Sequence, residues 1–206
     1  QPEYTQVIDL SRDSEQILAD MKPNNRNIYR NFQSKGISIR TSRRPDDITI
    51  FLGFMHRVAN RNHMTPHSDS YYRTQANTLF PLHAAKLFIA EFEGSPIAAA
   101  IAYDTETTRY YAHAAADDTY RKLAAGTALL AYMIMDAKQM GKIAFDLYGI
   151  APPDQPHHPW AGFTKFKQSF GGTPVAHIGA WDYPLQKMPF YAYKLYQILR
   201  ALHIRN

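Results

Sequence analysis

The chain contains no cysteine among its 206 residues, and this absence removes several kinds of chemistry. Without a thiol, the protein can form no disulfide, use no thiolate nucleophile and bind no zinc through cysteine. Histidine could still hold a metal, but the nine histidines include no HExxH motif, and His157 and His158 lie in a proline-rich loop. We therefore interpret the histidines as structural or solvated residues and expect no metal site.

Long hydrophobic runs are also absent. No apolar segment approaches the roughly 18 residues that a transmembrane helix needs, and the first residues, QPEYTQ, lack the pattern of a signal peptide. We therefore expect a soluble, cytoplasmic protein with at most peripheral membrane contact. Because the sequence begins without Met, we also expect a fragment or a processed chain.

The composition is that of a globular protein with one sizeable core. Hydrophobic residues make up 45% of the chain and aromatic residues 13%, which is enough to bury a core, so we expect a single domain over residues 1–206. The chain has 23 Lys and Arg against 18 Asp and Glu, a formal net charge of +5. This excess favours anionic partners such as phosphates or RNA without identifying one.

The stretch FDLYGIAPPDQPHHPWAGFTKFKQSF, residues 145–170, carries most of the functional information. It opens as a short apolar run that predicts a strand. Four prolines, which lack an N–H donor and fix φ, then end the strand and begin a loop. They are Pro152, Pro153, Pro156 and Pro159.

After the loop, the spacing of the aromatic residues predicts a helix. Trp160, Phe163, Phe166 and Phe170 recur at intervals of three and four, which gathers them on one helical face, and Lys167 lies beside that face. An ammonium held against aromatic surface is partly desolvated, which lowers its pKa and strengthens its attraction for developing negative charge. The alternative is a lysine that reaches past a core stripe to water.

The remaining patterns predict an alternation of helices and strands. In the first half, the predicted elements are a strand at 5–10, a helix that begins at a cap in 11–14, bends at Pro23 and ends at Gly36, a strand at 37–40, and helices at 48–59 and 68–80. In the second half, they are a meander of antiparallel strands at 87–92, 97–103 and 109–115, a long helix at 120–141, strands at 142–150 and 177–183, and a closing helix at 190–202.

This order predicts an α/β fold with a mixed, mainly antiparallel central sheet covered by helices, and it resembles the GNAT plan of the acyl-CoA N-acyltransferases. GNAT enzymes usually begin the helix after the meander with Gln/Arg-x-x-Gly-x-Gly/Ala, whose amides hold pyrophosphate. Here the segment from Arg121 to Gly126 fits that pattern only with Ala124 in place of the first glycine. A basic first turn on a core helix is the alternative reading.

Two segments strongly resemble the FemABX family, the aminoacyltransferases that form peptidoglycan bridges. They are FDLYGIAPPD, residues 145–154, and HPWAGFTKFKQSFGG, residues 158–172; the Arg26-Asn-Ile-x-Arg30 helix and the Tyr120-Arg-Lys helix start support the resemblance. It covers essentially the whole chain but only the second of the two tandem GNAT-like domains of a full-length member. It implies transfer of an amino acid from aminoacyl-tRNA to the stem-peptide amine of a peptidoglycan precursor.

The resemblance also implies catalytic residues. The Phe-Lys pair of the family's FKxGF-like segment falls on Phe166 and Lys167, with Ser169 where glycine is common. The lysine is then the electrostatic catalyst at the tRNA ester, and aminoacyl-tRNA is a co-substrate with no further cofactor. The implied partners are aminoacyl-tRNA, a UDP-linked or lipid-linked muropeptide, and a second GNAT-like domain or chain.

Other residues are candidates for substrate binding. The resemblance places Arg26 and Arg30 at the precursor's diphosphate, which arginine can bind in bidentate fashion, although both could belong to a solvated face. Further candidates with structural alternatives are Tyr71 and Tyr72, which could bind substrate or pack, and Asp146 and Tyr148, which could orient the amine or Lys167 or end a strand.

Two other functions remain open on the sequence. A GNAT-type acyl-CoA-dependent N-acyltransferase would share the fold, although the altered segment from Arg121 to Gly126 counts against it. A non-catalytic substrate-binding half-domain would explain why only one of the family's two domains is present.

Overall fold

A computed structural model describes residues 2–62, 64–179 and 181–203. The chain divides into two compact units, one spanning Pro2–His177 and the other containing the segment from Ile178 onward. The second unit holds one helix, α7 (Lys187–His203), which confirms the predicted closing helix and extends it by three residues at its start. The single domain predicted over residues 1–206 stays a prediction.

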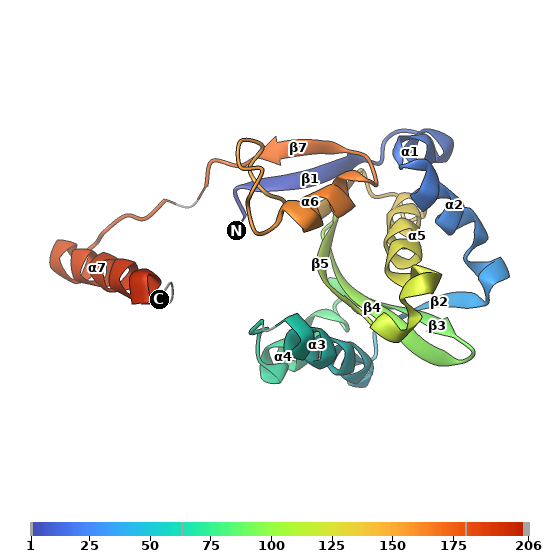
Figure 1. The fold of residues 1–206 in the computed structure, drawn as a ribbon, viewed down its shortest axis with the longest axis horizontal. Helices are drawn as coiled ribbons and strands as arrows, with labels where there is room; N and C mark the ends of the chain where they lie inside the picture. The colour runs from blue at the N-terminus through green and yellow to red at the C-terminus, as the bar shows by residue number, and fades with distance from the viewer. Residues whose placement is uncertain (1, 63, 180, 204–206) are drawn as a thin grey trace. The chain divides into compact units, whose positions relative to one another are not determined.

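The larger unit is built on a seven-stranded sheet with the order β2-β3-β4-β5-β6-β1-β7 (Figure 1). Neighbouring strands are antiparallel except for β5 and β6, which run parallel. The strands are β1 (Tyr4–Asp9), β2 (Ile37–Ser42), β3 (Ala85–Phe92), β4 (Ser95–Asp104), β5 (Thr108–Ala116), β6 (Ala144–Gly149) and β7 (Thr173–Ala176). The predicted meander is confirmed as β3, β4 and β5.

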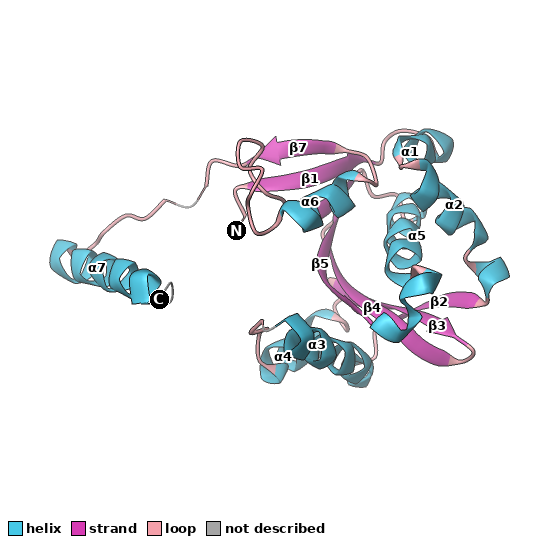
Figure 2. Cartoon of the chain, in the orientation of Figure 1, coloured by secondary structure: helices cyan, strands magenta, loops and turns pink. Residues whose placement is uncertain are grey.

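Helices cover both faces of this sheet, with α3 and α4 on one side and α1, α2 and α5 on the other (Figure 2). The α-helices are α1 (Ser14–Asp20), α2 (Pro23–Asn31), α3 (Ile48–Asn62), α4 (Asp69–Leu79), α5 (Ala125–Gln139) and α6 (Ala161–Gln168). Short 3-10 helices stand at η1 (Gln33–Lys35), η2 (Pro45–Asp47) and η3 (Asp118–Leu123). Among the helices described, none combines the length and hydropathy needed to cross a membrane.

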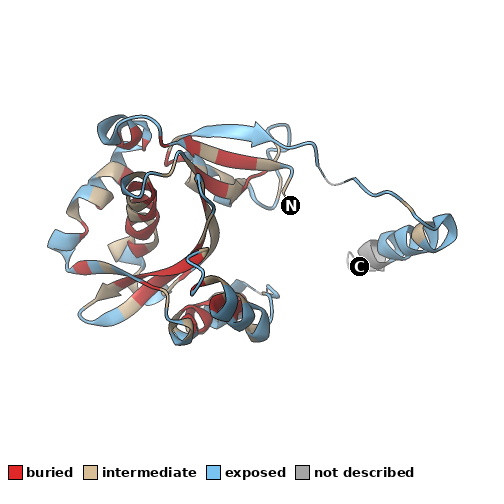
Figure 3. Cartoon of the chain, turned by 180° about the vertical axis from the view of Figure 1, so that it is seen from behind, coloured by how far each residue is buried: buried red, intermediate tan, exposed pale blue. Residues whose placement is uncertain are grey.

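The two layers bury alternate residues of the central strands. On β3, Phe88 packs with α5, whereas Leu87 and Ile89 pack with α3 and α4. The strand β4 is alanine-rich and almost entirely buried, and its small side chains let helices approach both faces closely (Figure 3). This double burial explains why β3 and β4 read as continuous apolar runs and not as alternating ones.

The sheet opens between its two parallel strands. Pairing of β5 with β6 covers only Thr108–Tyr110 against Ala144–Asp146. Beyond that point β5 continues along β4 to Ala116, while β6 stays paired with β1. The backbone edges and side chains that face the opening are therefore free to line a site.

Two predicted elements are wrong in position. The long helix begins at Ala125 and not at Tyr120, because Ala124 has a left-handed backbone (φ 52°) that separates α5 from η3. The described part of the predicted strand 177–183 contains no strand. The strand is instead β7, since Gly171 and Gly172, both at positive φ, turn the chain directly back along β1. Pro174 is tolerated there because β7 is an edge strand.

Candidate active site at the opening of the sheet

The last residues of β6 form an unusual backbone turn at the opening. Tyr148 has a left-handed conformation (φ 66°), which costs a residue with a side chain roughly 1–2 kcal/mol. The backbone N–H of Tyr148 donates a 2.6 Å hydrogen bond to Oδ1 of Asp146, which stabilises this conformation. The turn directs the carbonyl of Gly149 toward α6, where it accepts a hydrogen bond from Lys167.

The proline-rich loop is tied back onto α6 by a second polar contact. The backbone N–H of Ala151 donates a 2.8 Å hydrogen bond to Oγ1 of Thr164, whose hydroxyl donates to the carbonyl of Trp160 at 2.9 Å. Because Thr164 and Lys167 are three residues apart, they lie on the same side of α6. Both hold the segment that follows β6, so the helix and the turn form one unit.

The aromatic residues of the predicted stripe separate into two groups. Phe170 is fully buried and packs edge-on against Phe166, with 5.1 Å between ring centroids. Trp160 and Phe163 are 44% and 63% exposed. The spacing therefore predicted the helix correctly, but the aromatic residues do not form one buried face. Trp160 and Phe163 line open pockets, whereas Phe166 and Phe170 pack with the core.

Lys167 lies where the helix, the turn and the opening meet. Its Nζ donates a 2.6 Å hydrogen bond to the carbonyl oxygen of Gly149. Burial lowers the pKa of Lys167 to about 8, and the nearby carboxylate of Asp146 acts in the opposite direction. The lysine is therefore a partly desolvated ammonium near neutral pH, which is one of the two alternatives that the sequence left open.

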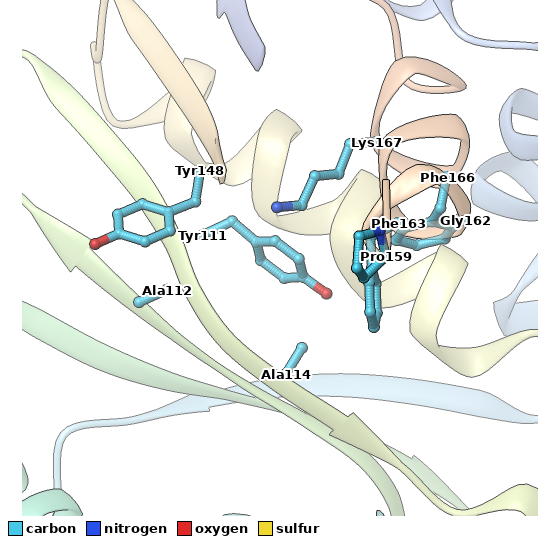
Figure 4. A pocket seen from close by; sticks show the side chains of 9 residues that line it. All are labelled: Tyr111, Ala112, Ala114, Tyr148, Pro159, Gly162, Phe163, Phe166 and Lys167. Carbon is cyan, nitrogen blue, oxygen red and sulfur yellow. The ribbon is translucent and has the colours of Figure 1, made fainter. Parts of the chain in front are cut away.

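A pocket of about 560 Å³ opens in front of this ammonium. Figure 4 shows the Lys167 side chain reaching from α6 toward the side of the pocket where Tyr111 and Tyr148 lie. A smaller pocket of about 230 Å³ shares Lys167, Tyr148 and Phe163 with it, so the lysine stands between two cavities. The larger pocket is lined by Tyr111, Ala112, Ala114, Tyr148, Pro159, Gly162, Phe163, Phe166 and Lys167.

The lining is mostly apolar, with a few polar groups directed into it. Burial raises the pKa of Tyr111, so its hydroxyl stays a neutral hydrogen-bond donor. An ammonium and a phenol in a mostly apolar pocket can stabilise an oxyanion that forms there, because apolar surroundings screen charges less than water does. Tyr111 was not among the predicted site residues, since only the opening of the sheet exposes this position of β5 to the pocket.

The structure brings Phe166, Lys167 and Tyr148 together at the pockets, with Asp146 directly behind them. It places Arg26 elsewhere, on α2, where Nη1 donates to three carbonyls at the end of α1, at 3.1–3.3 Å. Arg30 forms an exposed ion pair with Glu15, at 3.1 Å. Neither arginine lines the two pockets around Lys167.

Alanine substitutions are expected to separate the roles of these two arginines. Arg26→Ala should lower the free energy of unfolding by about 1 kcal/mol, because carbonyls at the end of α1 lose their donor. Arg30→Ala should change stability little, since exposed ion pairs contribute about 0–1 kcal/mol, but should weaken binding of UDP-linked muropeptide roughly tenfold. Urea denaturation and ligand titration measure the two effects. If Arg30→Ala leaves the affinity unchanged, Arg30 is part of a solvated face.

Tyr71 and Tyr72 lie on α4, which packs on the other face of the sheet. Tyr72 is buried against Phe51 and His113. Tyr71 is 38% exposed and stacks on His67, with 4.2 Å between ring centroids. Burial and the neighbouring His67 lower the pKa of His113 to about 4, so this histidine is neutral. Tyr72 thus has a packing role, while the hydroxyl-bearing ring of Tyr71 remains accessible.

A third pocket, of about 270 Å³, lies at the start of α5. It includes Arg121, Ala124 and Gly126, the residues of the altered phosphate-binding pattern, and shares Phe166 with the pocket around Lys167. Ala124 occupies a left-handed position that glycine adopts without strain. The segment thus lies at the start of the helix after the meander, where the GNAT pattern has its phosphate-binding loop, but Ala124 places a methyl group at the turn.

Comparisons with known proteins agree with this arrangement. The sequence profile of the FemAB family matches residues 1–95 and 82–200. The chain superposes on the crystal structure of FemX with a TM-score of 0.82 and 15% identity, covering 94% of this chain and 64% of FemX. A search of curated protein sequences found no match.

Two further solved structures share the fold. L-PGS from Bacillus licheniformis matches with a TM-score of 0.59 and 14% identity, over 84% of this chain and 58% of its own length. An aminoglycoside acetyltransferase from an uncultured soil metagenomic sample matches with a TM-score of 0.51 and 14% identity, over 74% of this chain and 98% of its own. The fold is therefore GNAT-like, as predicted.

Proposed function

The chain belongs to the FemAB family, and we propose that it transfers an aminoacyl group from aminoacyl-tRNA to the stem-peptide amine of a peptidoglycan precursor. Membership supports, at the level of the family, an acyltransferase that builds peptidoglycan bridges. The observation that carries the proposal for this chain is the partly buried ammonium of Lys167, held on the Gly149 carbonyl between two pockets.

The proposed reaction is the aminolysis of an ester. The amine nitrogen attacks the carbonyl carbon of the aminoacyl ester, and the carbonyl oxygen becomes an oxyanion. Lys167 stabilises this oxyanion electrostatically. The intermediate then collapses: the bond from the carbonyl carbon to the tRNA oxygen breaks, the amide remains, and the proton lost by the amine balances the one gained by the released tRNA hydroxyl. The chain supplies no covalent intermediate in this scheme.

Phe166 and Tyr148 are proposed to shape the site around the ester. The Phe166 ring lines the pocket and is anchored by Phe170, so it can exclude water from the reacting carbonyl. Tyr148 lines both pockets and can contact either substrate. These contacts would favour aminolysis over hydrolysis, because a water molecule that reached the ester would compete with the amine.

The acceptor site is proposed to need a second GNAT-like domain or chain. This chain spans 64% of the length of FemX, and Arg30 and Tyr71, the more exposed of the predicted binding residues, lie away from Lys167. A muropeptide, whether UDP-linked or lipid-linked, is long enough to reach residues outside the pocket. We therefore assign the ester end of the reaction to this chain and part of the acceptor site to the other domain.

The rate advantage of the wild-type chain over Lys167→Met is expected to shrink as the pH rises above 8. Burial lowers the pKa of Lys167 to about 8, so the ammonium predominates below this pH and the neutral amine above it. Only the ammonium stabilises an oxyanion. Taking the ratio of the two rates at each pH cancels the ionisation of the substrate amine. A ratio that grows above pH 8 would contradict the proposal and indicate that neutral Lys167 acts as a base.

Separate titrations with aminoacyl-tRNA, UDP-linked muropeptide and acetyl-CoA test the proposed substrate class. We expect saturable binding of aminoacyl-tRNA and none of acetyl-CoA at micromolar concentration, because Ala124 replaces the glycine that permits close approach of pyrophosphate. Saturation by acetyl-CoA alone would overturn the proposal. The pocket at the start of α5 makes an acyl-CoA-dependent N-acyltransferase the second candidate in that case.

A non-catalytic substrate-binding half-domain is the remaining alternative. It would bind the muropeptide or the tRNA but would transfer nothing, even with a second GNAT-like domain supplied. A transfer assay therefore separates it from the proposed enzyme, because binding measurements alone would look alike for both.

A further inference from the structure

The carboxylate of Asp146 stands behind the pocket and not in it. Asp146 is 7% exposed and lies on β6 at the last residue paired with β5. It lines neither pocket around Lys167, so it does not reach a substrate bound there. A buried carboxylate is costly unless hydrogen bonds and a counter-charge stabilise it. The contacts that hold Asp146 therefore indicate what it does.

The contacts come from β6 itself and from the neighbouring strand β1. The backbone N–H of Tyr148 donates to Oδ1 at 2.6 Å, and the hydroxyl of Thr5 on β1 acts to lower the pKa of the Asp146 carboxyl. Thr5 is 4% exposed, and its Oγ1 lies 3.1 Å from Nε2 of His177, just after β7. A hydroxyl has one hydrogen, so Thr5 either donates to the His177 ring or accepts from it, according to which ring nitrogen carries the proton.

His177 is itself held in place beside β1. Its backbone N–H donates to the carbonyl of Glu3 at 2.8 Å, which continues the pairing of β7 past its last residue. Thr5 thus joins β1 to the segment after β7, and Asp146 joins β6 to the turn before Gly149.

We propose that Asp146 is the positioning residue for Lys167: its carboxylate fixes the left-handed turn whose Gly149 carbonyl receives the lysine, and its charge favours the ammonium. The inference deepens the proposed function, because it explains how the chain keeps a partly buried lysine charged. The turn needs such support, since Tyr148 adopts φ 66° with a full side chain. Thr5 acts one step further away, since its hydroxyl lowers the pKa of Asp146 and so favours the charged carboxylate.

Other charged or titratable groups near the lysine do not replace Asp146. On β5, Tyr111 contributes a phenol that stays neutral, because burial raises its pKa. From β6, Tyr148 contributes another phenol, and on α6 itself Lys165 is exposed. Among the residues that the structure describes, Asp146 is the charge that shifts the pKa of Lys167, and it opposes the effect of burial. Burial raises the pKa of Asp146, while its hydrogen bonds and the charges of His177 and Lys167 lower it.

The test measures the titration of Lys167 directly, without relying on catalysis. Trace labelling of the intact chain with acetic anhydride over a range of pH, followed by mass spectrometry of the peptide that contains Lys167, gives the midpoint of its ionisation. Asp146→Asn keeps an oxygen for the Tyr148 N–H but removes the charge. We expect the midpoint to fall by about one pH unit. Asp154→Asn, in the exposed proline-rich loop, is the control and should leave it unchanged.

An unchanged midpoint in a folded Asp146→Asn chain would overturn the inference. If Asp146→Asn does not fold, the double variant Asp146→Asn with Tyr148→Gly replaces it, because glycine adopts the left-handed turn without strain. The same lowered midpoint is then expected, and its absence would again overturn the inference.

A parallel transfer assay separates this inference from the proposed function. If the wild-type chain transfers no amino acid with a second GNAT-like domain supplied, but the midpoint still shifts in Asp146→Asn, the proposed function fails and the positioning role stands. If transfer is lost equally at every pH with no shift of the midpoint, Asp146 only supports the fold of the turn, and the inference fails.

Discussion

Lys167→Met is expected to abolish most aminoacyl transfer while the chain remains folded. Methionine keeps the length and the apolar stem of lysine but removes the ammonium that donates to the Gly149 carbonyl. Removing a preorganised group of this kind commonly costs about 2.7–4 kcal/mol, or roughly 10² to 10³ in rate. The rate of transfer from aminoacyl-tRNA to muropeptide measures the effect, in an assay that supplies the second GNAT-like domain the proposal requires.

Lys165→Met is the matched control for this substitution. Lys165 lies on the same helix but is exposed and lines none of the pockets around Lys167, so its loss should leave the rate almost unchanged. Lys167→Arg should give little rescue, because a planar guanidinium displaces the charge within a site that fits a compact ammonium. A Lys167→Met chain that is folded and transfers at nearly the wild-type rate would rule out the proposed role of the lysine.

Arg109→Met is expected to cause the largest loss of stability. Arg109 is completely buried on β5; its Nε and Nη2 donate to the two carboxylate oxygens of Asp104, at 2.6 and 2.9 Å, and Nη1 pairs with Asp136. Lys86 donates to Asp136 as well, at 2.6 Å. Burial alone would raise the pKa of Asp136, but the hydrogen bonds from Lys86 and Arg109 lower it, so the carboxylate is charged.

Removal of the Arg109 guanidinium takes away a buried charged partner from the carboxylates of Asp104 and Asp136. Loss of one member of such a group typically costs about 3–5 kcal/mol, so urea denaturation should show a strongly lowered free energy of unfolding. Arg40→Met is the control: Arg40 is exposed on the edge strand β2 and pairs with Glu91 at 2.8 Å and with Asp47 at 3.6 Å, and each such exposed pair contributes about 0–1 kcal/mol. Equal losses for the two variants would show that the buried network adds no special stability.

Much of the fold follows from local sequence patterns. The meander was predicted because its strand-forming runs and its two polar turns depend on residues that are close in the chain. The bend at Pro23 and the end at Gly36 were predicted for the same reason, since proline and glycine restrict or free the backbone wherever they stand. Local spacing also placed Lys167 beside an aromatic helix face after the proline-rich loop.

Local patterns failed where long-range contacts decide the outcome. The last strand was predicted seven residues long at 177–183, but the chain pairs with β1 earlier, at Thr173–Ala176, because the two glycines return it there at once. The side chain of Arg26 likewise meets carbonyls at the end of α1, a contact that the helical spacing did not indicate; its phosphate-binding role, which the family resemblance implies, stays a prediction. Neither contact has a signature in the residues next to it.

By itself, the sequence determined the type and order of most elements and the position of Lys167 beside an aromatic helix face, because propensity, capping and helical spacing depend on neighbouring residues. Only the tertiary structure decided how that lysine is held. Its site joins the parting of β5 from β6, which exposes Tyr111, to the buried carboxylate of Asp146, which bonds to the turn before Gly149. Beside this carboxylate, Thr5 and His177 are hydrogen-bonded although they lie 172 positions apart, and such contacts follow from the packing of the whole sheet and not from any local pattern.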